Sequence, residues 1–516
     1  MYPSFNQFCR WASHYSAVPI WIEPELPSGD LMEWVHSLAG TQQKFFFLHS
    51  ASSGPQARYS YIALDTPRHS VESSEGMLTL RYHSENGSRV DSLKIGNPFD
   101  RFHDWLKHFT APHVDGLPPF WGGAVGYFGY ETARYLDPTF KELFSSKRAK
   151  PHALATEKFN EFEFGIYDAV AIVDHARQRL WLVHTILLPE GKVLSPVQLE
   201  KHYRLGQDRL RRYAVDLQKA LHHKRAWGSF RTSEIRSNRS EAAYRLMVRR
   251  AKGHIAAGDI YQANLSHIFS GTWEGDPWTL YRRITSLNPS PYAALWRSAT
   301  RWMVSASPEL LLRQEADWVE TRPIAGTYPR NPESLDDHKI LQALGQDVKE
   351  RAEHIMLVDL ERNDLGRVCR PSSVRVAETL AMETYSHVVH LVSDIRGKLK
   401  EGKTWRDVLQ ASFPGGTITG CPKIRCMELI DKLESQRRGP YCGSLGWIGF
   451  TGDMTLNILI RTYFMDKGRL CFPAGAGIVA DSDPQREYFE TLHKAHALLE
   501  ALEPQSTFKF LPQGGS

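Results

Sequence analysis

Short apolar runs separated by glycine, proline, asparagine and serine dominate the first part of the chain. Between residues 45 and 185 they read FFFLHS, RYSYIAL, GMLTLRY, AVGYFGY and YDAVAIVDHARQRLWLV. Runs of this length that are rich in β-branched and aromatic residues and bounded by turn-forming residues are typical of strands. The pattern therefore predicts a largely antiparallel sheet with occasional helices.

A charged stretch with helical spacing separates this part from the rest of the chain. Within residues 196–224 the apolar positions include Leu205, Leu210 and Leu217, and a basic, polar segment then runs from residue 222 to 240. We take that segment as a boundary. The expected regions are residues 1–225 and residues 226–516.

Helices and strands alternate irregularly in the second region. Ser240 can cap a helix over residues 240–258, because apolar residues such as Tyr244 follow at helical spacing. Further helices are expected at residues 341–360, 422–433 and 484–502, and strands at YQANLSHIF, RWMVSASPELLLR, WVETRPIAG, GSLGWIGF, TLNILIRTYF and RLCFPAGAGIVA. Since the regular βαβ rhythm of a parallel sheet is absent, we expect an α+β fold, a large antiparallel β-sandwich flanked by helices.

Composition narrows the range of partners. The 516 residues carry 63 Lys and Arg against 58 Asp and Glu, a net charge of +5 at pH 7, without a block of like charges. A nucleic-acid partner is therefore not expected, whereas a small anionic substrate needs only local cations. There is no secretory leader pattern and no apolar run of about 18 residues, so we expect a cytoplasmic protein with no membrane segment. The six cysteines lack CxxC spacing and are expected to be buried, reduced thiols.

Two predicted helices carry carboxylates in matching positions. Glu350 and Glu353 share a face of one helix, and Glu487, Glu490 and Lys494 share a face of the other. If the two faces converge, their hard oxygen donors suit Mg²⁺, which commonly takes one or two carboxylates and keeps several waters. Spacing by itself favours the simpler interpretation, two solvated helix faces.

Two glycine-rich turns lead into helices. PAGAGI precedes a helix that Asp483 can cap and Pro484 can begin, and FPGGTITG precedes a helix with Pro422 near its first turn. Backbone N–H groups at such turns favour a carboxylate or a phosphate, although a plain helix entry has the same pattern. No GK[ST] closes either turn, so a nucleotide-binding P-loop is not expected.

The motifs of the second region resemble those of a known family. Between about residues 237 and 502 they follow in the order GDIYQANLS, SASPELL, TRPIAGTYPR, AEHIMLVDLERNDLGRV, HVVHLVSDIRGKL, FPGGTITGCPKIR, CGSLGWIGF and AGAGIVADSDPQREYFET. They are similar to the motifs of chorismate-utilising enzymes, which include anthranilate synthase component I, aminodeoxychorismate synthase component I, isochorismate synthase and salicylate synthase. FLHSASSGPQARYSYIAL and WGGAVGYFGYETARY resemble the N-terminal half of the first two. The resemblance implies a fold like that of anthranilate synthase component I.

The resemblance also implies roles around one chorismate molecule. Glu353 and Glu490 would hold Mg²⁺, with Glu350 and Glu487 close by or binding through its waters. Glu309 in SASPE would be the general acid for the departing hydroxyl, a role that requires a raised pKa. The remaining contacts would be Arg461, Lys494, Tyr441 and the backbone at Gly475 and Gly477 for the enolpyruvyl carboxylate, and Gly326, Thr327 and His390 for the ring.

Gln262 distinguishes ammonia-using from water-using relatives. Relatives that add water have a lysine where this chain has Gln262 in IYQANL. A base is needed to activate water, whereas ammonia is already a nucleophile. The resemblance therefore implies amination, and it places Gln262 among the catalytic residues.

Two aminating reactions remain open. YQANL, LHS, FPGGTITGCPK and QRRGPYCGSLGW are closer to the folate-pathway enzyme, aminodeoxychorismate synthase component I, than to anthranilate synthase component I of the tryptophan pathway. Against this, Ala325 in PIAGT stands where many folate-pathway enzymes have a lysine that adds to the ring. We expect the transaminase-class enzyme that forms 4-amino-4-deoxychorismate, on the route to 4-aminobenzoate. The alternative is 2-amination of chorismate to anthranilate.

The source of ammonia is expected to lie outside this chain. A Gly-x-Cys-x-Gly nucleophile elbow, typical of a glutamine amidotransferase, is not found in the sequence. Ammonia would therefore come from a separate glutaminase subunit or from solution. Release of pyruvate to give 4-aminobenzoate would fall to another enzyme, because no lyase domain is recognised either.

Another group of residues falls where relatives hold tryptophan, either as feedback inhibitor or as a structural ligand. These residues are Ser50, Arg58, Tyr59, Pro291 and Tyr292. His49 replaces a glutamate of those relatives and Ala293 replaces a methionine, so strong inhibition by tryptophan is not expected. Packing explains the five residues equally well.

Overall fold

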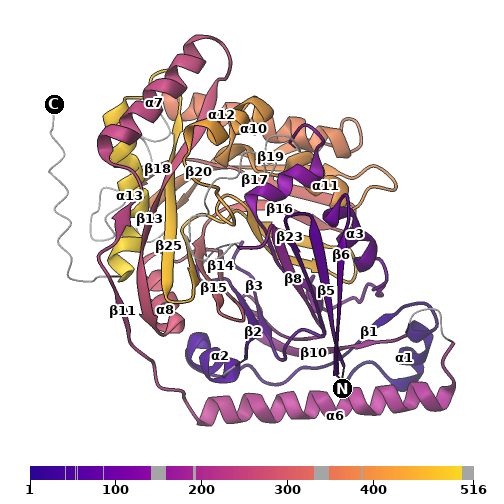
Figure 1. Cartoon of the computed structure of the whole chain (residues 1–516). Coiled ribbons are helices and arrows are strands. Elements are labelled where there is room, and N and C mark those ends of the chain that lie inside the picture. Colours follow the sequence, from indigo (N-terminus) through magenta and orange to yellow (C-terminus); the bar gives the residue numbers. More distant parts are fainter. Residues whose placement is uncertain are drawn as a thin grey trace.

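Two large antiparallel sheets form the body of the protein (Figure 1). The structure is a computed structural model that describes residues 1–40, 42–52, 54, 56–84, 87–140, 159–189, 193–329, 348–384 and 388–502. The strand pairs within these residues are antiparallel, as the short apolar runs predict. The predicted α+β fold with a large antiparallel β-sandwich is confirmed.

The first sheet joins strands from both ends of the sequence. In spatial order its strands are β1 (Ala17–Ile22), β10 (Arg179–Leu187), β9 (Ala169–Asp174), β3 (Tyr59–Ala63), β2 (Lys44–His49), β14 (Tyr292–Ser298), β15 (Arg301–Ser307), β24 (Thr462–Asp466), β25 (Arg469–Ile478), β13 (Gln262–Gly275) and β11 (Phe230–Thr232), with β12 (Arg236–Ser237) and β21 (Gly420–Cys421) also paired to β13.

The second sheet is built in the same way. Its order is β18 (Ile324–Pro329), β20 (Val388–Lys398), β17 (Trp318–Arg322), β16 (Leu310–Glu315), β23 (Met454–Asn457), β22 (Ser444–Gly449), β7 (Gly123–Phe128), β8 (Phe162–Tyr167), β4 (His69–Ser74), β5 (Met77–Ser84) and β6 (Gly87–Lys94), with β19 (Arg375–Thr384) paired to β20. Strands from both predicted regions thus share each sheet, as in the pairs β2 with β14 and β7 with β22. The predicted boundary near residue 225 stays a prediction.

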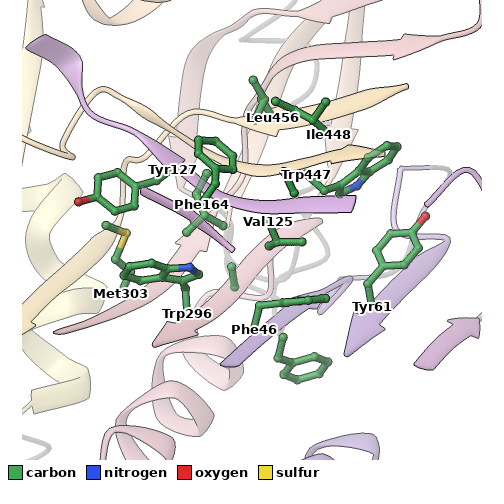
Figure 2. Close-up of a cluster of buried hydrophobic side chains, with 14 of the residues drawn as sticks. Phe46, Tyr61, Val125, Tyr127, Phe164, Trp296, Met303, Trp447, Ile448 and Leu456 are labelled. Carbon is green, nitrogen blue, oxygen red and sulfur yellow. The ribbon is translucent and has the colours of Figure 1, made fainter. Parts of the chain in front are cut away.

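The core lies between the two sheets. Figure 2 shows Phe46, Tyr61 and Trp296 of the first sheet facing Val125 and Trp447 of the second. All of these side chains are buried, and burying a side chain of this size stabilises the fold by roughly 1.5–3 kcal/mol. Aromatic contacts cross the interface, for example Tyr61 with Trp447 at 6.1 Å between ring centroids.

Helices cover the outside of the sandwich (Figure 1). They are α1 (Phe5–Ala12), α2 (Leu31–Ala39), α3 (Pro98–Leu106), α4 (Ala133–Leu136), α6 (Pro196–His222), α7 (Glu241–Ala256), α8 (Pro277–Leu287), α10 (Val348–Val368), α11 (Trp405–Ser412), α12 (Lys423–Leu433) and α13 (Pro484–Leu502), with short 3₁₀ turns η1 (Tyr130–Thr132) and η3 (Gly416–Ile418). Figure 1 shows α6 along the bottom, and α7, α10 and α12 at the opposite end. None of the helices within the described residues has the length and apolar character that a bilayer crossing requires.

The predicted helices mostly begin and end where the sequence indicates. Ser240 caps α7 by accepting from Ala243 N, and Asp483 caps α13 by accepting from Gln485 N and Arg486 N. The exception is the helix predicted over residues 341–360. Residues 341–347 lie outside the described residues, and α10 continues to Val368 because Leu365 and Val368 pack into the core.

Candidate active site

Glu309 lies where the chain passes from the first sheet to the second. Strand β15 ends at Ser307 in one sheet, and β16 begins at Leu310 in the other. The chain returns from β23 to β24 through residues 458–461. The two crossings are bonded together, because Ile458 N donates to Glu309 O at 3.0 Å and Ser307 Oγ donates to Ile458 O at 2.6 Å. The predicted strand RWMVSASPELLLR is therefore two strands, with Glu309 held at the crossing between them.

The surroundings of Glu309 favour its protonated form. The residue is 5% exposed, and burial raises the pKa of its carboxyl from 4.5 to about 7. The Thr417 hydroxyl, the backbone of Ile324 and the charges of Arg461 and Lys494 each hold that pKa lower than burial alone would. A carboxyl with a pKa near neutrality can donate a proton under ordinary conditions, as the predicted general acid must.

Two cations face the same region as Glu309. Arg461 lies in the second crossing with φ of 49°, and its guanidinium donates to Asn288 Oδ1 at 3.2 Å. Lys494 lies on α13 and forms an ion pair with Glu490 at 2.7 Å. Since both cations lower the pKa of Glu309, the structure brings the predicted acid into the electrostatic reach of the predicted carboxylate-binding side chains.

Gln262 lies at the start of β13, against a glycine of β25. A Cβ atom on Gly477 would be 2.7 Å from Gln262 Nε2, and one on Gly475 would be 2.7 Å from Asn264 Oδ1. The two strands pair with Asn264 opposite Gly477. Glycine at 477 therefore makes room for the Gln262 amide, which the structure places beside the predicted backbone sites.

Arg438 connects several of the predicted site segments, although sequence reasoning gave it no role. Its buried guanidinium donates to Glu434 at 2.7 Å, to Ile418 O at 2.9 Å and to Asn264 O at 2.8 Å. It also lies over the ring of Tyr441, 5.7 Å from the centroid. One side chain thus holds η3, β13 and Tyr441 in a fixed arrangement.

The residues predicted to line the ring lie on neighbouring strands. Thr327 of β18 is opposite His390 of β20 in the register, and His390 is 1% exposed. Only the backbone is described for Ala325, Gly326 and Thr327. Ile324 of the same strand contributes its backbone to the environment of Glu309, so β18 borders the acid.

The predicted metal-binding carboxylates lie on α10 and α13. Glu353 is partly buried on α10, and Glu487 of α13 is 5% exposed. Only the backbone of Glu350 is described. Among the residues that the structure describes, no group of three or more histidine, cysteine, aspartate or glutamate side chains is gathered closely enough to hold a metal. Glu490 of α13 is 47% exposed and pairs with Lys494. A Mg²⁺ ion needs only one or two protein carboxylates, and carboxylate oxygens are donors of the kind it prefers.

Comparison with known proteins identifies the family. A family model described as chorismate binding enzyme matches residues 46–500. The chain belongs to the chorismate binding enzyme family. The ordered motifs that border Glu309, Gln262 and Arg461 all lie within the matched residues.

Relatives of this chorismate binding enzyme carry two different names. The chain is 38% identical to aminodeoxychorismate synthase component 1 of Bacillus subtilis, over 92% of this chain and 94% of that protein. It is 40% identical to anthranilate synthase component 1 of Thermus thermophilus, over 89% and 92%. The crystal structure of anthranilate synthase component I from Streptococcus pneumoniae aligns with a TM-score of 0.70 and 32% identity, over 86% and 92% of the two chains. Membership of the family is therefore shown, and both aminating reactions are represented among the relatives.

A cavity in this chorismate binding enzyme is lined by the residues predicted for tryptophan. Its volume is about 310 Å³, and it lies between β2, β3 and β14 of the first sheet and β16, β22 and β23 of the second. The predicted residues that line it are Ser50, Arg58, Tyr59, Pro291 and Tyr292. Arg58 is paired there with Asp174 at 2.9 Å, and Ser50 Oγ donates to Tyr59 O. His49 also lines it, and burial lowers the pKa of its imidazole to about 3, so the ring is neutral. The structure brings the five residues together, while binding of tryptophan stays a prediction.

The cysteines are not among the predicted site residues, although Cys426 Sγ donates to Gln262 O at 2.9 Å. All six are free thiols; Cys369, Cys426, Cys442 and Cys471 are buried, and Cys9 and Cys421 are partly buried. Burial raises the pKa of Cys442 and Cys471 to about 12, which keeps these thiols protonated. The prediction of burial holds for four of the six, and the reduced state of the thiols stays a prediction.

Proposed function

We propose that this chain aminates chorismate at C4, giving 4-amino-4-deoxychorismate. The proposal rests first on Glu309, a buried acid with a pKa near 7 that faces Arg461 and Lys494 inside a chorismate binding enzyme. It is also supported by the similarity to the Bacillus subtilis aminodeoxychorismate synthase component 1. The folate-type motifs YQANL and FPGGTITGCPK favour C4 over C2.

The reaction requires one proton donor and no base for the nucleophile. Ammonia forms a C–N bond at C4 while the C4–O bond breaks, and the hydroxyl leaves as water with a proton from Glu309. The ammonium nitrogen then returns a proton to the Glu309 carboxylate or to solvent. Gln262 would orient the reactants as a neutral amide, because ammonia needs no deprotonation to react. Ala325 has no amine, so we propose direct attack without a covalent enzyme intermediate.

The substrate carboxylates would be held by separate parts of the site. Arg461, Lys494, the Tyr441 phenol and the backbone at Gly475 and Gly477 would bind the enolpyruvyl carboxylate. Glu353 and Glu490 would hold Mg²⁺, with Glu350 and Glu487 near its waters, and bound Mg²⁺ would neutralise the ring carboxylate. Glu490 is paired with Lys494 in the structure. If Glu490 bound a cation, Lys494 would lose its ion-pair partner, and its ammonium could then bind an anionic ligand.

Ammonia would reach this site from a separate glutaminase subunit. Both synthase relatives described above are named as component 1, a name that implies a second component. This proposal is tested by comparing ammonium with glutamine as the nitrogen source. The purified chain with chorismate and Mg²⁺ should turn over with ammonium and not with glutamine alone. Turnover with glutamine alone, or a hydroxylated product formed without ammonium, would contradict the proposal.

The second candidate function is 2-amination to anthranilate. It is favoured by the 40% identity to the Thermus thermophilus relative. It is also favoured by Ala325, which stands where many folate-pathway enzymes have a lysine. The two candidates share the acid, the cations and the metal site. They differ in the carbon that receives nitrogen, so only the product separates them.

A further inference from the structure

The side chains at the start of β13 alternate between the two faces of the first sheet. Ala263 and Leu265 pack into small apolar clusters with residues of α7 and α12, on the face that these helices cover. Successive side chains of a strand point to opposite faces. Gln262 and Asn264 therefore share the face that is turned away from α7 and α12.

Two glycines of the neighbouring strand allow both amides to lie close to it. Strands β13 and β25 are paired side by side, with Asn264 opposite Gly477 (Figure 1). A Cβ atom at Gly475 would be 2.7 Å from Asn264 Oδ1, and one at Gly477 would be 2.7 Å from Gln262 Nε2. A larger residue at either position would displace an amide, so the two strands present both amides on one glycine-lined surface.

The carbonyl oxygens of these two amides are buried acceptors. Neither Gln262 Oε1 nor Asn264 Oδ1 has a hydrogen-bond partner among the residues that the structure describes, and Gln262 is only 6% exposed. An unpaired buried acceptor lowers the stability of a protein, and native structures contain few of them. Two such oxygens, two residues apart on one face of a strand, indicate a ligand that brings hydrogen-bond donors.

The backbone of Asn264 is held without the help of its side chain. Arg438 donates to Asn264 O at 2.8 Å, and Asn264 N donates to Thr419 O at 2.9 Å. Ser266 is the next residue on the same face, and its hydroxyl donates to Glu434 at 2.8 Å. The polar row on this face is therefore paired at Ser266 and open at the two amides.

In the proposed reaction, ammonia is the reactant that complements two acceptors. It has three N–H donors and one lone pair, whereas the carboxylates of chorismate are acceptors themselves. Hydrogen bonds to the two carbonyl oxygens would use N–H groups and leave the lone pair free to attack the ring. A donor in the same place would occupy that lone pair and weaken the nucleophile.

We propose that Gln262 Oε1 and Asn264 Oδ1 bind the ammonia that this enzyme adds to chorismate. Asn264 is then a substrate-binding residue that motif resemblance did not indicate. The inference rests on the proposed function, because it requires amination, but it holds for nitrogen added at C4 or at C2.

Asn264→Leu removes the acceptor and nearly keeps the size of the side chain. With ammonium chloride at fixed pH and ionic strength, we expect the KM for ammonia to rise by about three- to tenfold, the loss typical of one hydrogen bond, and the KM for chorismate to stay within about twofold of wild type. The variant also loses an unpaired buried acceptor, so its melting temperature should equal or exceed that of wild type. Asn264→Ala should give the same split between the two KM values, and it decides if the leucine variant does not fold.

Asn238→Leu is the matched control, because Asn238 lies beside β13 and its amide is paired. Its Oδ1 accepts from Ile268 N at 2.9 Å, and its Nδ2 donates to Gln436 at 3.1 Å. This variant should have a lower melting temperature and an unchanged KM for ammonia. The two leucine variants thus separate an amide that binds ammonia from one that stabilises the fold.

Two results would overturn the inference while the proposed function stands. One is a wild-type KM for ammonia in Asn264→Leu, in a chain that forms the 4-amino product. The other is a parallel rise of both KM values with a lower melting temperature, which is the pattern of a structural side chain. Formation of anthranilate, with a raised KM for ammonia in the variant, would refute C4 amination and support the ammonia site. A chain that forms only a hydroxylated product would refute both.

Discussion

The backbone carbonyl of Glu309 accepts a hydrogen bond from the amide of Ile458 at 3.0 Å. Each residue lies in a segment that crosses between the two sheets, and the second crossing ends at Arg461. Acid and cation are therefore fixed by the same pair of crossings, at the junction of the two sheets. Residues placed on such a junction have little freedom to move, which suits groups that must act on one small ligand.

Glu309→Gln should remove turnover and change how stability depends on pH. We expect kcat to fall by about 10²-fold or more, because the variant cannot donate a proton. Burial raises the pKa of Glu309 from 4.5 to about 7, so the folded protein keeps a proton that the unfolded chain loses between these values. Wild-type stability should therefore fall as pH rises from 5 to 8, relative to the variant, by about 3 kcal/mol. Urea unfolding at several pH values measures this, and parallel pH dependence in the two proteins would contradict it.

Arg438→Ala should lower both the stability of the protein and its activity. The variant leaves Glu434 buried without its guanidinium, which typically destabilises a protein by about 3–5 kcal/mol. Arg438→Lys should not restore activity, because an ammonium cannot donate to Glu434, Ile418 and Asn264 with the planar fork of arginine. Thermal unfolding and steady-state kinetics test this. The neighbouring Arg437→Ala is the control, and equal losses in the two alanine variants would argue against a specific role for Arg438.

Gly477→Ala should affect catalysis more than stability. The added Cβ would meet the end of the Gln262 side chain at 2.7 Å, and that amide can turn away at little cost to the fold. We expect kcat/KM to fall by about tenfold or more through misplacement of the amide. Gly253→Ala, on the exposed face of α7, meets nothing within 4 Å and should leave kcat/KM unchanged. Full activity in Gly477→Ala would mean that Gln262 does not orient the reactants.

Glu353→Ala should weaken the response to Mg²⁺ while the protein remains folded. We expect a higher Mg²⁺ concentration for half-maximal turnover, because one hard oxygen ligand is lost. Calorimetric titration of Mg²⁺ in the presence of chorismate gives a second readout that does not depend on turnover. Asp359→Ala on the same helix is the control, because its side chain is 64% exposed and pairs only with Arg362 among the described ion pairs. An unchanged Mg²⁺ response in Glu353→Ala would show that the metal assignment is wrong.

Local interactions explain which parts of this structure the sequence could predict. The start of α13 depends on Asp483 and Pro484, which act on backbone groups within three residues, and it lies where expected. The chain crossing at Glu309 depends on pairing of β16 with β23, more than 140 residues away, and no local pattern encodes that. For the same reason TLNILIRTYF reads as one strand, whereas the structure breaks it at residues 458–461.

The same distinction between local and long-range interactions applies to the residues of the site. Motif resemblance could indicate Glu309, Gln262 and Arg461, because these residues lie in short, recognisable segments. It could not indicate Arg438, whose contacts join distant elements. The Arg438 guanidinium donates to Asn264 O, 174 residues away, and to Ile418 O, 20 residues away. Such buried polar contacts are visible only once the chain is folded.

The position of the new nitrogen tests the central claim most directly. The purified chain is incubated with chorismate, Mg²⁺ and ¹⁵N-ammonium, and the product is examined by mass spectrometry and NMR. We predict a product that keeps the enolpyruvyl group and carries ¹⁵N on C4. Formation of ¹⁵N-anthranilate, with release of pyruvate and no added lyase, would contradict the account.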